Sequence, residues 1–118
     1  MKKIYYLASC DTCKRIIKAL DLPSEFEKQE IKEDELTVKQ LDALAKMAGS
    51  YEALFSKRAK LYKERGLKDE VLTERDFKRL LLEHYTFLQR PVIVSGDKIF
   101  IGNSKKVVAA AKEAIHQS

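Results

Sequence analysis

The sequence predicts an α/β protein built on a mixed four-stranded sheet, with helices on the faces of the sheet and a helical insertion. Three observations support this fold class. A strand–helix–strand pattern begins the chain, helical signals fill its middle, and two apolar strands joined by a tight turn precede a last helix. The first pattern implies parallel pairing through a crossover, and the hairpin adds antiparallel pairing, so the sheet is expected to be mixed.

The first three elements follow from apolar spacing and from turn residues. Lys3–Leu7 is a short apolar run, and the small and polar residues of Ala8–Cys13 favour a tight passage into a helix. Pro23 ends that helix. Phe26–Ile31 is assigned to a second strand on the topology more than on its own pattern, which polar residues interrupt. The apolar face of the helix comprises Ile16, Ile17, Ala19 and Leu20.

The middle of the chain is predicted to be helical. Thr37 and Gln40 have the spacing of a capping box, which marks the start of a helix. Ser50 is expected to cap a short helix through Phe55, and Tyr62–Leu67 is predicted to be a turn or another short helix. Thr73 is expected to cap the last helix of this stretch.

Two strands and a helix complete the predicted order. Val92–Val94 and Lys98–Ile101 are apolar strands, and Ser95–Asp97 between them contains the glycine that a hairpin turn favours. A final helix is expected after Ser104. This is the element order of the thioredoxin fold, with a helical insertion from about 35 to 89, and residues 1–118 are expected to form a single domain.

Composition narrows the classes of function. The 118 residues include 23 basic and 18 acidic side chains, for a net charge of +5. Such a mild excess is typical of solvated helix faces, with an anion site or an acidic partner as the sharper interpretation. Direct binding of nucleic acid is not expected, because the chain lacks a dense basic stripe. No apolar run is long enough for a membrane span or a signal peptide, so a cytoplasmic protein is expected.

Cys10 and Cys13 are the candidate catalytic residues. Two cysteines at this spacing in a cytosolic chain indicate redox or metal chemistry more than a disulfide framework. Cys10 is expected at the end of a strand beside the unpaired N–H groups of the first helical turn, which favour its thiolate. Lys14 lies one turn away and acts in the same direction. Cys13 is expected to be less exposed and placed to resolve a mixed disulfide on Cys10.

Two other interpretations of the cysteine pair remain open. The thiols could be buried structural residues without chemistry. They could also form half of a zinc site, which needs two further ligands. His84 and His116 are the available histidines, and they lie far apart in the sequence. His116 is expected to lie in a frayed tail, and no metal site is predicted.

Arg90 and Pro91 provide the second signal of a site. Pro91 opens an apolar strand after a helix, and in the thioredoxin fold a proline in that position is cis and faces the cysteine loop. The alternative is a trans proline that ends the helix. A guanidinium suits an oxyanion better than an ammonium group does, so Arg90 is a candidate to bind an anion beside Cys10, or else one more surface arginine.

These residues, in this order, resemble the arsenate reductase-like family, which includes the Spx-type regulators. The cysteine loop alone is weakly specific, whereas the loop and the Arg-Pro-Val-Ile run at this distance are specific together. The resemblance spans nearly the whole chain, and the matching stretches are Tyr5–Arg15, Leu54–Tyr62, Glu64–Leu67, Arg90–Val94 and Ile101–Gly102.

The resemblance implies a thioredoxin core with a helical insertion and a nucleophilic Cys10. In arsenate reductases of this type three arginines hold the oxyanion, and glutathione with glutaredoxin completes the reduction. Arg90 matches one of those arginines, whereas Ser56 and either Gly102 or Asn103 stand in the places of the other two. Arg58 matches an arginine of the Spx-like and uncharacterised branches of the family. A histidine that precedes the cysteine in the reductases is replaced by Tyr6 here.

Three functions follow as hypotheses. The first is a thiol-dependent oxidoreductase that uses Cys10 and Cys13 on a small thiol or oxyanion substrate, with Arg90, Arg58 and Lys14 as anion-binding residues. It is expected to hold no bound cofactor and to take electrons from glutathione, thioredoxin or glutaredoxin. The second is an Spx-like redox-sensing regulator that binds the alpha subunit of RNA polymerase. The third is a true arsenate reductase, and inert thiols remain the alternative to all three.

Overall fold

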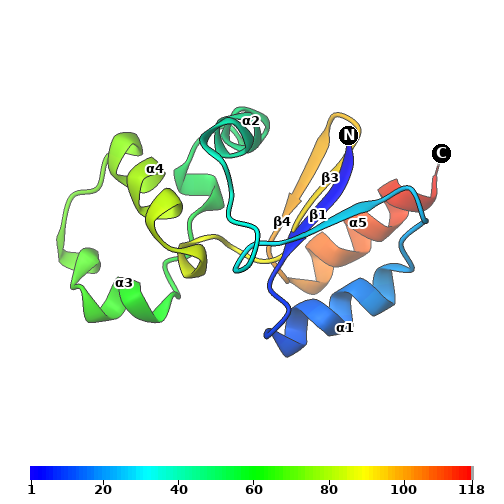
Figure 1. The fold of residues 1–118 in the computed structure, drawn as a ribbon, viewed down its shortest axis with the longest axis horizontal. Coiled ribbons are helices and arrows are strands. Elements are labelled where there is room, and N and C mark those ends of the chain that lie inside the picture. The colour runs from blue at the N-terminus through cyan, green and yellow to red at the C-terminus, as the bar shows by residue number, and fades with distance from the viewer. Residues whose placement is uncertain (118) are drawn as a thin grey trace. The chain divides into compact units, whose positions relative to one another are not determined.

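The computed structural model describes residues 1–117, which form two compact units. The first unit combines Met1–Asp34 with the segment that begins at Arg90, and the second unit is Glu35–Gln89 (Figure 1). The second unit occupies the stretch for which the sequence predicts a helical insertion. The assignment of both units to a single domain stays a prediction.

The first unit contains the predicted mixed four-stranded sheet. Its strands are β1 (Lys2–Tyr6), β2 (Glu27–Glu30), β3 (Val92–Ser95) and β4 (Lys98–Ile101), in the order β2-β1-β3-β4. β1 pairs with β2 in parallel, and the β1–β3 and β3–β4 pairs are antiparallel. This arrangement confirms the mixed sheet that the crossover and the hairpin predict.

Strand β2, whose sequence lacks a clear apolar pattern, lies at one edge of the sheet. Its backbone pairs with β1 from Glu27 opposite Lys3 to Glu30 opposite Tyr6. An edge strand tolerates exposed charged side chains, and Glu27 and Lys28 are both exposed. The Ile31 N–H extends the ladder by donating to the Tyr6 carbonyl at 2.9 Å.

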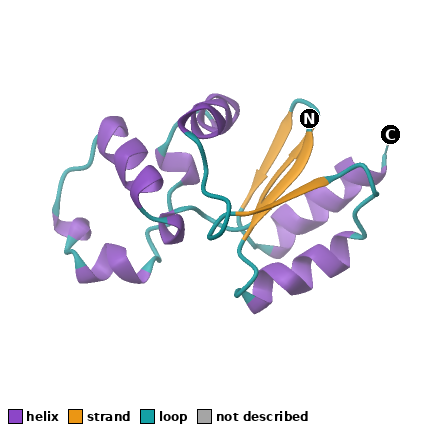
Figure 2. Ribbon diagram, in the orientation of Figure 1, coloured by secondary structure: helices purple, strands orange, loops and turns teal. Residues whose placement is uncertain are grey.

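Helices α1 (Asp11–Leu20) and α5 (Lys105–His116) lie on the same face of the sheet (Figure 2). Their apolar stripes share one core with the two central strands. Burial of these side chains from water is the main favourable contribution to the stability of this layer. The buried members of this core are Ile4, Ile16, Leu20, Phe26, Ile93, Ala111 and Ile115.

The expectation that His116 lies in a frayed tail is wrong. His116 is the last residue of α5, and its Nε2 lies 2.7 Å from the carbonyl oxygen of Leu20. A carbonyl oxygen only accepts, so Nε2 carries the proton and donates to the last residue of α1. This contact satisfies a carbonyl that the end of α1 would otherwise leave without a helical partner.

The second unit consists of short helices around an aromatic cluster. Its α-helices are α2 (Val38–Ala48), α3 (Lys60–Glu64) and α4 (Glu74–Glu83), and its 3-10 turns span Glu52–Leu54, Leu67–Asp69 and Tyr85–Phe87. The Phe55 ring packs against the rings of Tyr62, Phe77 and Phe87. The short helix predicted after Ser50 is a 3-10 turn, and the Ser50 hydroxyl accepts from the Ala53 N–H.

Among residues 1–117, no helix has the length and apolar character needed to cross a membrane.

The predicted capping box at Thr37 and Gln40 is present, the predicted cap Thr73 also forms one with Asp76, and the first supports a stability test. The Gln40 N–H donates to the Thr37 hydroxyl, and the Thr37 N–H donates to the Gln40 side-chain oxygen, each at 3.1 Å. Thr37→Ala should lower the free energy of unfolding by about 1 kcal/mol, because a helical N–H loses its acceptor. Urea denaturation followed by circular dichroism measures this loss. Thr37→Ser keeps the hydroxyl, and an equal loss in both variants would contradict the capping explanation.

Candidate active site

Cys10 is the N-cap residue of α1, and its sulfur performs the capping. The Cys10 backbone is extended, with φ −92° and ψ 111°, and the Cys13 N–H donates to the Cys10 Sγ at 3.4 Å. The N–H groups of a first helical turn have no carbonyl partner within the helix. The sulfur takes the place of the oxygen that a serine or aspartate usually supplies. Cys10 therefore faces several unpaired donors.

These contacts lower the pKa of Cys10. Burial acts in the opposite direction and favours the neutral thiol. Hydrogen bonds from the Cys13 N–H and the Cys13 thiol, together with the positive charge of Arg90, outweigh burial, and the Thr12 N–H contributes in the same direction. The pKa of Cys10 thus lies below its ordinary value, which increases the fraction of reactive thiolate at neutral pH.

Cys13 has the opposite character. Its side chain is fully buried, and this burial is the main reason why its pKa is raised to about 11. A Cys10 thiolate raises that pKa further, both through its charge and because it accepts a hydrogen bond from the Cys13 thiol, whereas the Leu7 backbone and Arg90 lower it. Both cysteines are free. The pair therefore combines a partly exposed thiolate with a buried neutral thiol.

Arg90 and Pro91 directly precede strand β3. Val92 pairs with Tyr5 in β1, so the residues before Val92 lie at the end of the sheet from which the cysteine loop leaves. The Arg90–Pro91 peptide bond is cis, and the Pro91 carbonyl accepts from the Gly102 N–H at 2.9 Å. The orientation of Pro91 toward the thiol stays a prediction.

The Arg90 guanidinium has an unused donor. Its Nη1 is buried and finds no hydrogen-bond acceptor among the described residues. A buried donor without an acceptor is costly, because it has lost water and gained nothing in exchange. A charged donor in this state, with its charge acting on both cysteines, is suited to an anionic group that arrives with a substrate.

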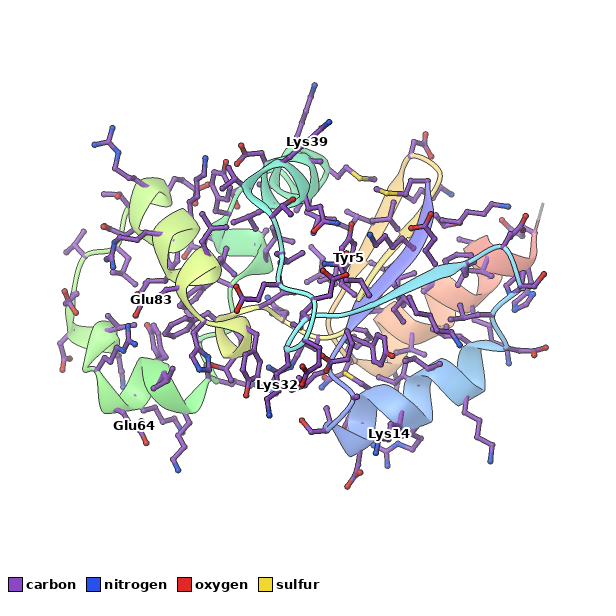
Figure 3. All side chains as sticks on the ribbon, viewed as in Figure 1. Tyr5, Lys14, Lys32, Lys39, Glu64 and Glu83 are labelled. Atoms are coloured by element: carbon purple, nitrogen blue, oxygen red, sulfur yellow. The ribbon has the colours of Figure 1, made fainter. Side chains whose placement is uncertain are left out.

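The other two predicted anion-binding residues differ in their placement. Lys14 is exposed on the outer side of α1 (Figure 3). Arg58 belongs to the second unit, where it is exposed in the loop before α3 and makes no hydrogen bond or ion pair within residues 1–117. Of the predicted site residues, the first unit therefore contains all except Arg58.

The two histidines are occupied by structural contacts. The Thr86 N–H donates to the His84 Nδ1 at 3.2 Å, and the Thr86 hydroxyl lies 2.8 Å from the same nitrogen. His116 is bonded to Leu20, as described above. Within the part of the chain that the structure describes, no three His, Cys, Asp or Glu side chains are grouped so that they could hold a metal ion.

Glu30 contacts the cysteine loop although sequence patterns did not single it out. Its carboxylate accepts from the N–H of Ala8, which lies two residues before Cys10, at 2.7 Å. The two residues are 22 positions apart in the chain. The only sequence signal is an acidic residue at the end of a strand parallel to β1, where the carboxyl ends of both strands meet at one edge.

Comparison with known proteins places the chain in a family. It is 26% identical over 105 residues to the global transcriptional regulator Spx 2 of Bacillus anthracis, which covers 86% of this chain and 79% of the relative. A solved structure of a putative ArsC family related protein from Bacteroides fragilis superposes with a TM-score of 0.77 at 22% identity, over 93% of this chain and 96% of the other.

An arsenate reductase from Vibrio cholerae also has a TM-score of 0.77, at 21% identity and with the same coverage of both chains. These likenesses confirm the predicted thioredoxin-like architecture and the resemblance to arsenate reductases and Spx proteins. The model of the ArsC family matches residues 5–111, which include the cysteine loop, the helical insertion and strands β3 and β4. This protein therefore belongs to the ArsC family.

Proposed function

We propose that the protein is a thiol-dependent oxidoreductase that reduces disulfide-type substrates, such as a glutathione adduct, through Cys10 and Cys13. The observation that carries this proposal is the capping of α1 by the Cys10 sulfur, with Cys13 buried one helical turn away. The two thiols differ in exposure and in the direction of their pKa shifts, as a nucleophile and a resolving thiol must.

In the first step the Cys10 thiolate attacks one sulfur of the substrate disulfide. A bond forms between Cys10 and that sulfur, the substrate S–S bond breaks, and the other half leaves as a thiolate that takes a proton from solvent. The Cys13 and Thr12 N–H groups that stabilise the Cys10 thiolate also hold its sulfur at the start of α1. Thiolate formation and orientation thus depend on the same donors.

In the second step Cys13 resolves the mixed disulfide. Covalent attachment removes the Cys10 charge and its hydrogen-bond acceptor, two of the causes that raise the pKa of Cys13. Cys13 then loses its proton more readily, attacks the Cys10 sulfur and releases the bound half of the substrate as a thiolate. The products are a Cys10–Cys13 disulfide and two substrate thiols, so two electrons pass from the protein to the substrate. An external thiol of the glutathione, thioredoxin or glutaredoxin class restores the dithiol.

In this proposal Arg90 binds an anionic group of the substrate. Its buried Nη1 has an unmet donor, and its charge acts on both thiols. The carboxylates of a glutathionyl group and an oxyanion such as arsenate share the chemistry that this donor recognises. Reduction of arsenate is less supported than reduction of a glutathione adduct. Ser56, and either Gly102 or Asn103, stand where the resemblance implies two further arginines.

A regulator of the Spx kind is the second candidate, favoured by the likeness to Spx 2 of Bacillus anthracis. In such a protein the same cysteine pair is a redox switch, and the exposed Arg58 matches an arginine of the Spx-like branch. Capture of the RNA polymerase alpha subunit by the oxidised or the reduced protein distinguishes the candidates. Redox-dependent capture without disulfide turnover would support the regulator, whereas turnover without capture would support the oxidoreductase.

Trapping of the mixed disulfide tests the assignment of the two thiols. Cys13→Ser should accumulate a stable adduct with oxidised glutathione, because the resolving thiol is missing. Intact-mass spectrometry should show one glutathionyl group on Cys10, and Cys10→Ser should acquire none at the same time. Equal labelling of both variants would contradict the assignment of Cys10 as the nucleophile.

Substitution of Arg90 tests its role in substrate binding. In the Cys13→Ser background, Arg90→Gln should slow adduct formation by about tenfold or more, because the thiolate and the anionic substrate both lose a charged partner. Arg90→Lys should recover part of the rate. Lys18→Gln removes an exposed cation at the other end of α1 and serves as the control. An unchanged rate in Arg90→Gln would overturn this role.

A further inference from the structure

The carboxylate of Glu30 connects the end of β2 to the cysteine loop. Glu30 is the last residue of β2 and pairs with Tyr6, the last residue of β1. Because the two strands are parallel, both chains leave the sheet at the same edge. The β1 chain continues into the cysteine loop, and the β2 chain continues into a turn that begins at Ile31.

The two oxygens of this carboxylate serve different segments. Oε2 accepts from the Ala8 N–H at 2.7 Å, whereas Oε1 accepts from the N–H groups of Lys32 and Glu33 at 2.8 Å and 2.9 Å. The bonds to Lys32 and Glu33 are local and stabilise the turn. The bond to Ala8 joins segments that lie 22 residues apart, so the turn alone does not explain it.

The Ala8 N–H belongs to the peptide unit that also contains the Leu7 carbonyl. That carbonyl accepts from the Cys10 N–H at 3.1 Å. Since a peptide unit is planar, a bond that fixes its N–H also fixes the direction of its carbonyl. Glu30 therefore holds one side of a rigid plane whose other side holds the backbone of Cys10.

We propose that Glu30 is a positioning residue for the thiol chemistry, which fixes the Leu7–Ala8 peptide and through it the Cys10 backbone at the start of α1. This inference rests on the proposed function, in which the Cys10 thiolate is the nucleophile. A charge-assisted hydrogen bond is short and strong, which suits a carboxylate to this task better than an amide. Glu30 contacts no substrate in this role and acts only through the backbone.

Substitution by glutamine separates this role from that of the turn. A glutamine has one accepting oxygen, so it can keep the bonds to Lys32 and Glu33 while an amide NH2 group replaces the acceptor of Ala8. Loss of the Glu30 negative charge alone would lower the Cys10 pKa. Loss of positioning would raise it, because the sulfur would meet its helix donors less often. The sign of the change therefore distinguishes the two effects.

The experiment compares Glu30→Gln with Glu27→Gln, which removes an exposed carboxylate from the same strand. Thiolate absorbance of Cys10 is measured against pH in the Cys13→Ser background, with thermal unfolding as the control for folding. Glu30→Gln should raise the Cys10 pKa and reduce the thiolate at neutral pH about threefold or more, and Glu27→Gln should leave both unchanged. An unchanged or lowered Cys10 pKa in a folded Glu30→Gln protein would overturn the proposal.

A measurement on the unsubstituted protein covers the case in which Glu30→Gln does not fold. The Ala8 amide proton should exchange slowly with solvent, and its NMR shift should titrate at low pH with the Glu30 carboxyl. Rapid exchange without such a titration would overturn the proposal. Failure of the proposed function gives a different result, in which Cys10 of the unsubstituted protein titrates at the value of a free thiol.

Discussion

The hydrogen bond from the Cys13 N–H to the Cys10 sulfur determines most of the properties of this site. The N-cap residue of a helix bonds to the N–H three positions later, so a Cys-x-x-Cys motif at a helix start places the second thiol where capping already brings the chain back. One geometry thus begins α1, favours the Cys10 thiolate and brings a buried thiol within reach of it. Strand β1 directs the loop to this place, and the shared core of α1 and α5 holds the helix there.

The surroundings of the pair make the two thiols unequal. Burial dominates at Cys13, whereas at Cys10 hydrogen bonds and the charge of Arg90 outweigh burial. The inequality depends on the reaction state, because the Cys10 thiolate itself raises the pKa of Cys13. In the proposed mechanism, formation of a mixed disulfide on Cys10 removes that influence when Cys13 has to react. Arg90, which precedes β3, adds its charge to both thiols, and its buried Nη1 has no acceptor among the described residues, which is why we propose that it binds an anionic substrate group.

Sequence patterns predicted those elements and site residues whose position depends on neighbouring residues in the chain. Apolar spacing located β1, β3, β4 and the larger helices, and the positions of Thr37 and Thr73 located two helix starts, whereas β2 followed from the topology more than from its own residues. The same is true of Cys10 and Cys13, whose spacing is a local property of a helix start. Long-range contacts were not predictable. Glu30 reaches Ala8 across 22 residues and His116 reaches Leu20 across 96, and no periodicity records either pairing. Propensity also did not distinguish the 3-10 turn after Ser50 from an α-helix, because a capping serine suits both.

The most direct test of this account is the rate of alkylation of each cysteine in the unsubstituted protein, measured against pH by mass spectrometry. Cys10 should react first, with an apparent pKa below the free-thiol value of about 8.5, and Cys13 should stay unreactive until far higher pH. Equal reactivity, with both thiols titrating near the free value, would contradict the account. The cysteine pair would then lack the asymmetry on which an exchange of disulfides depends.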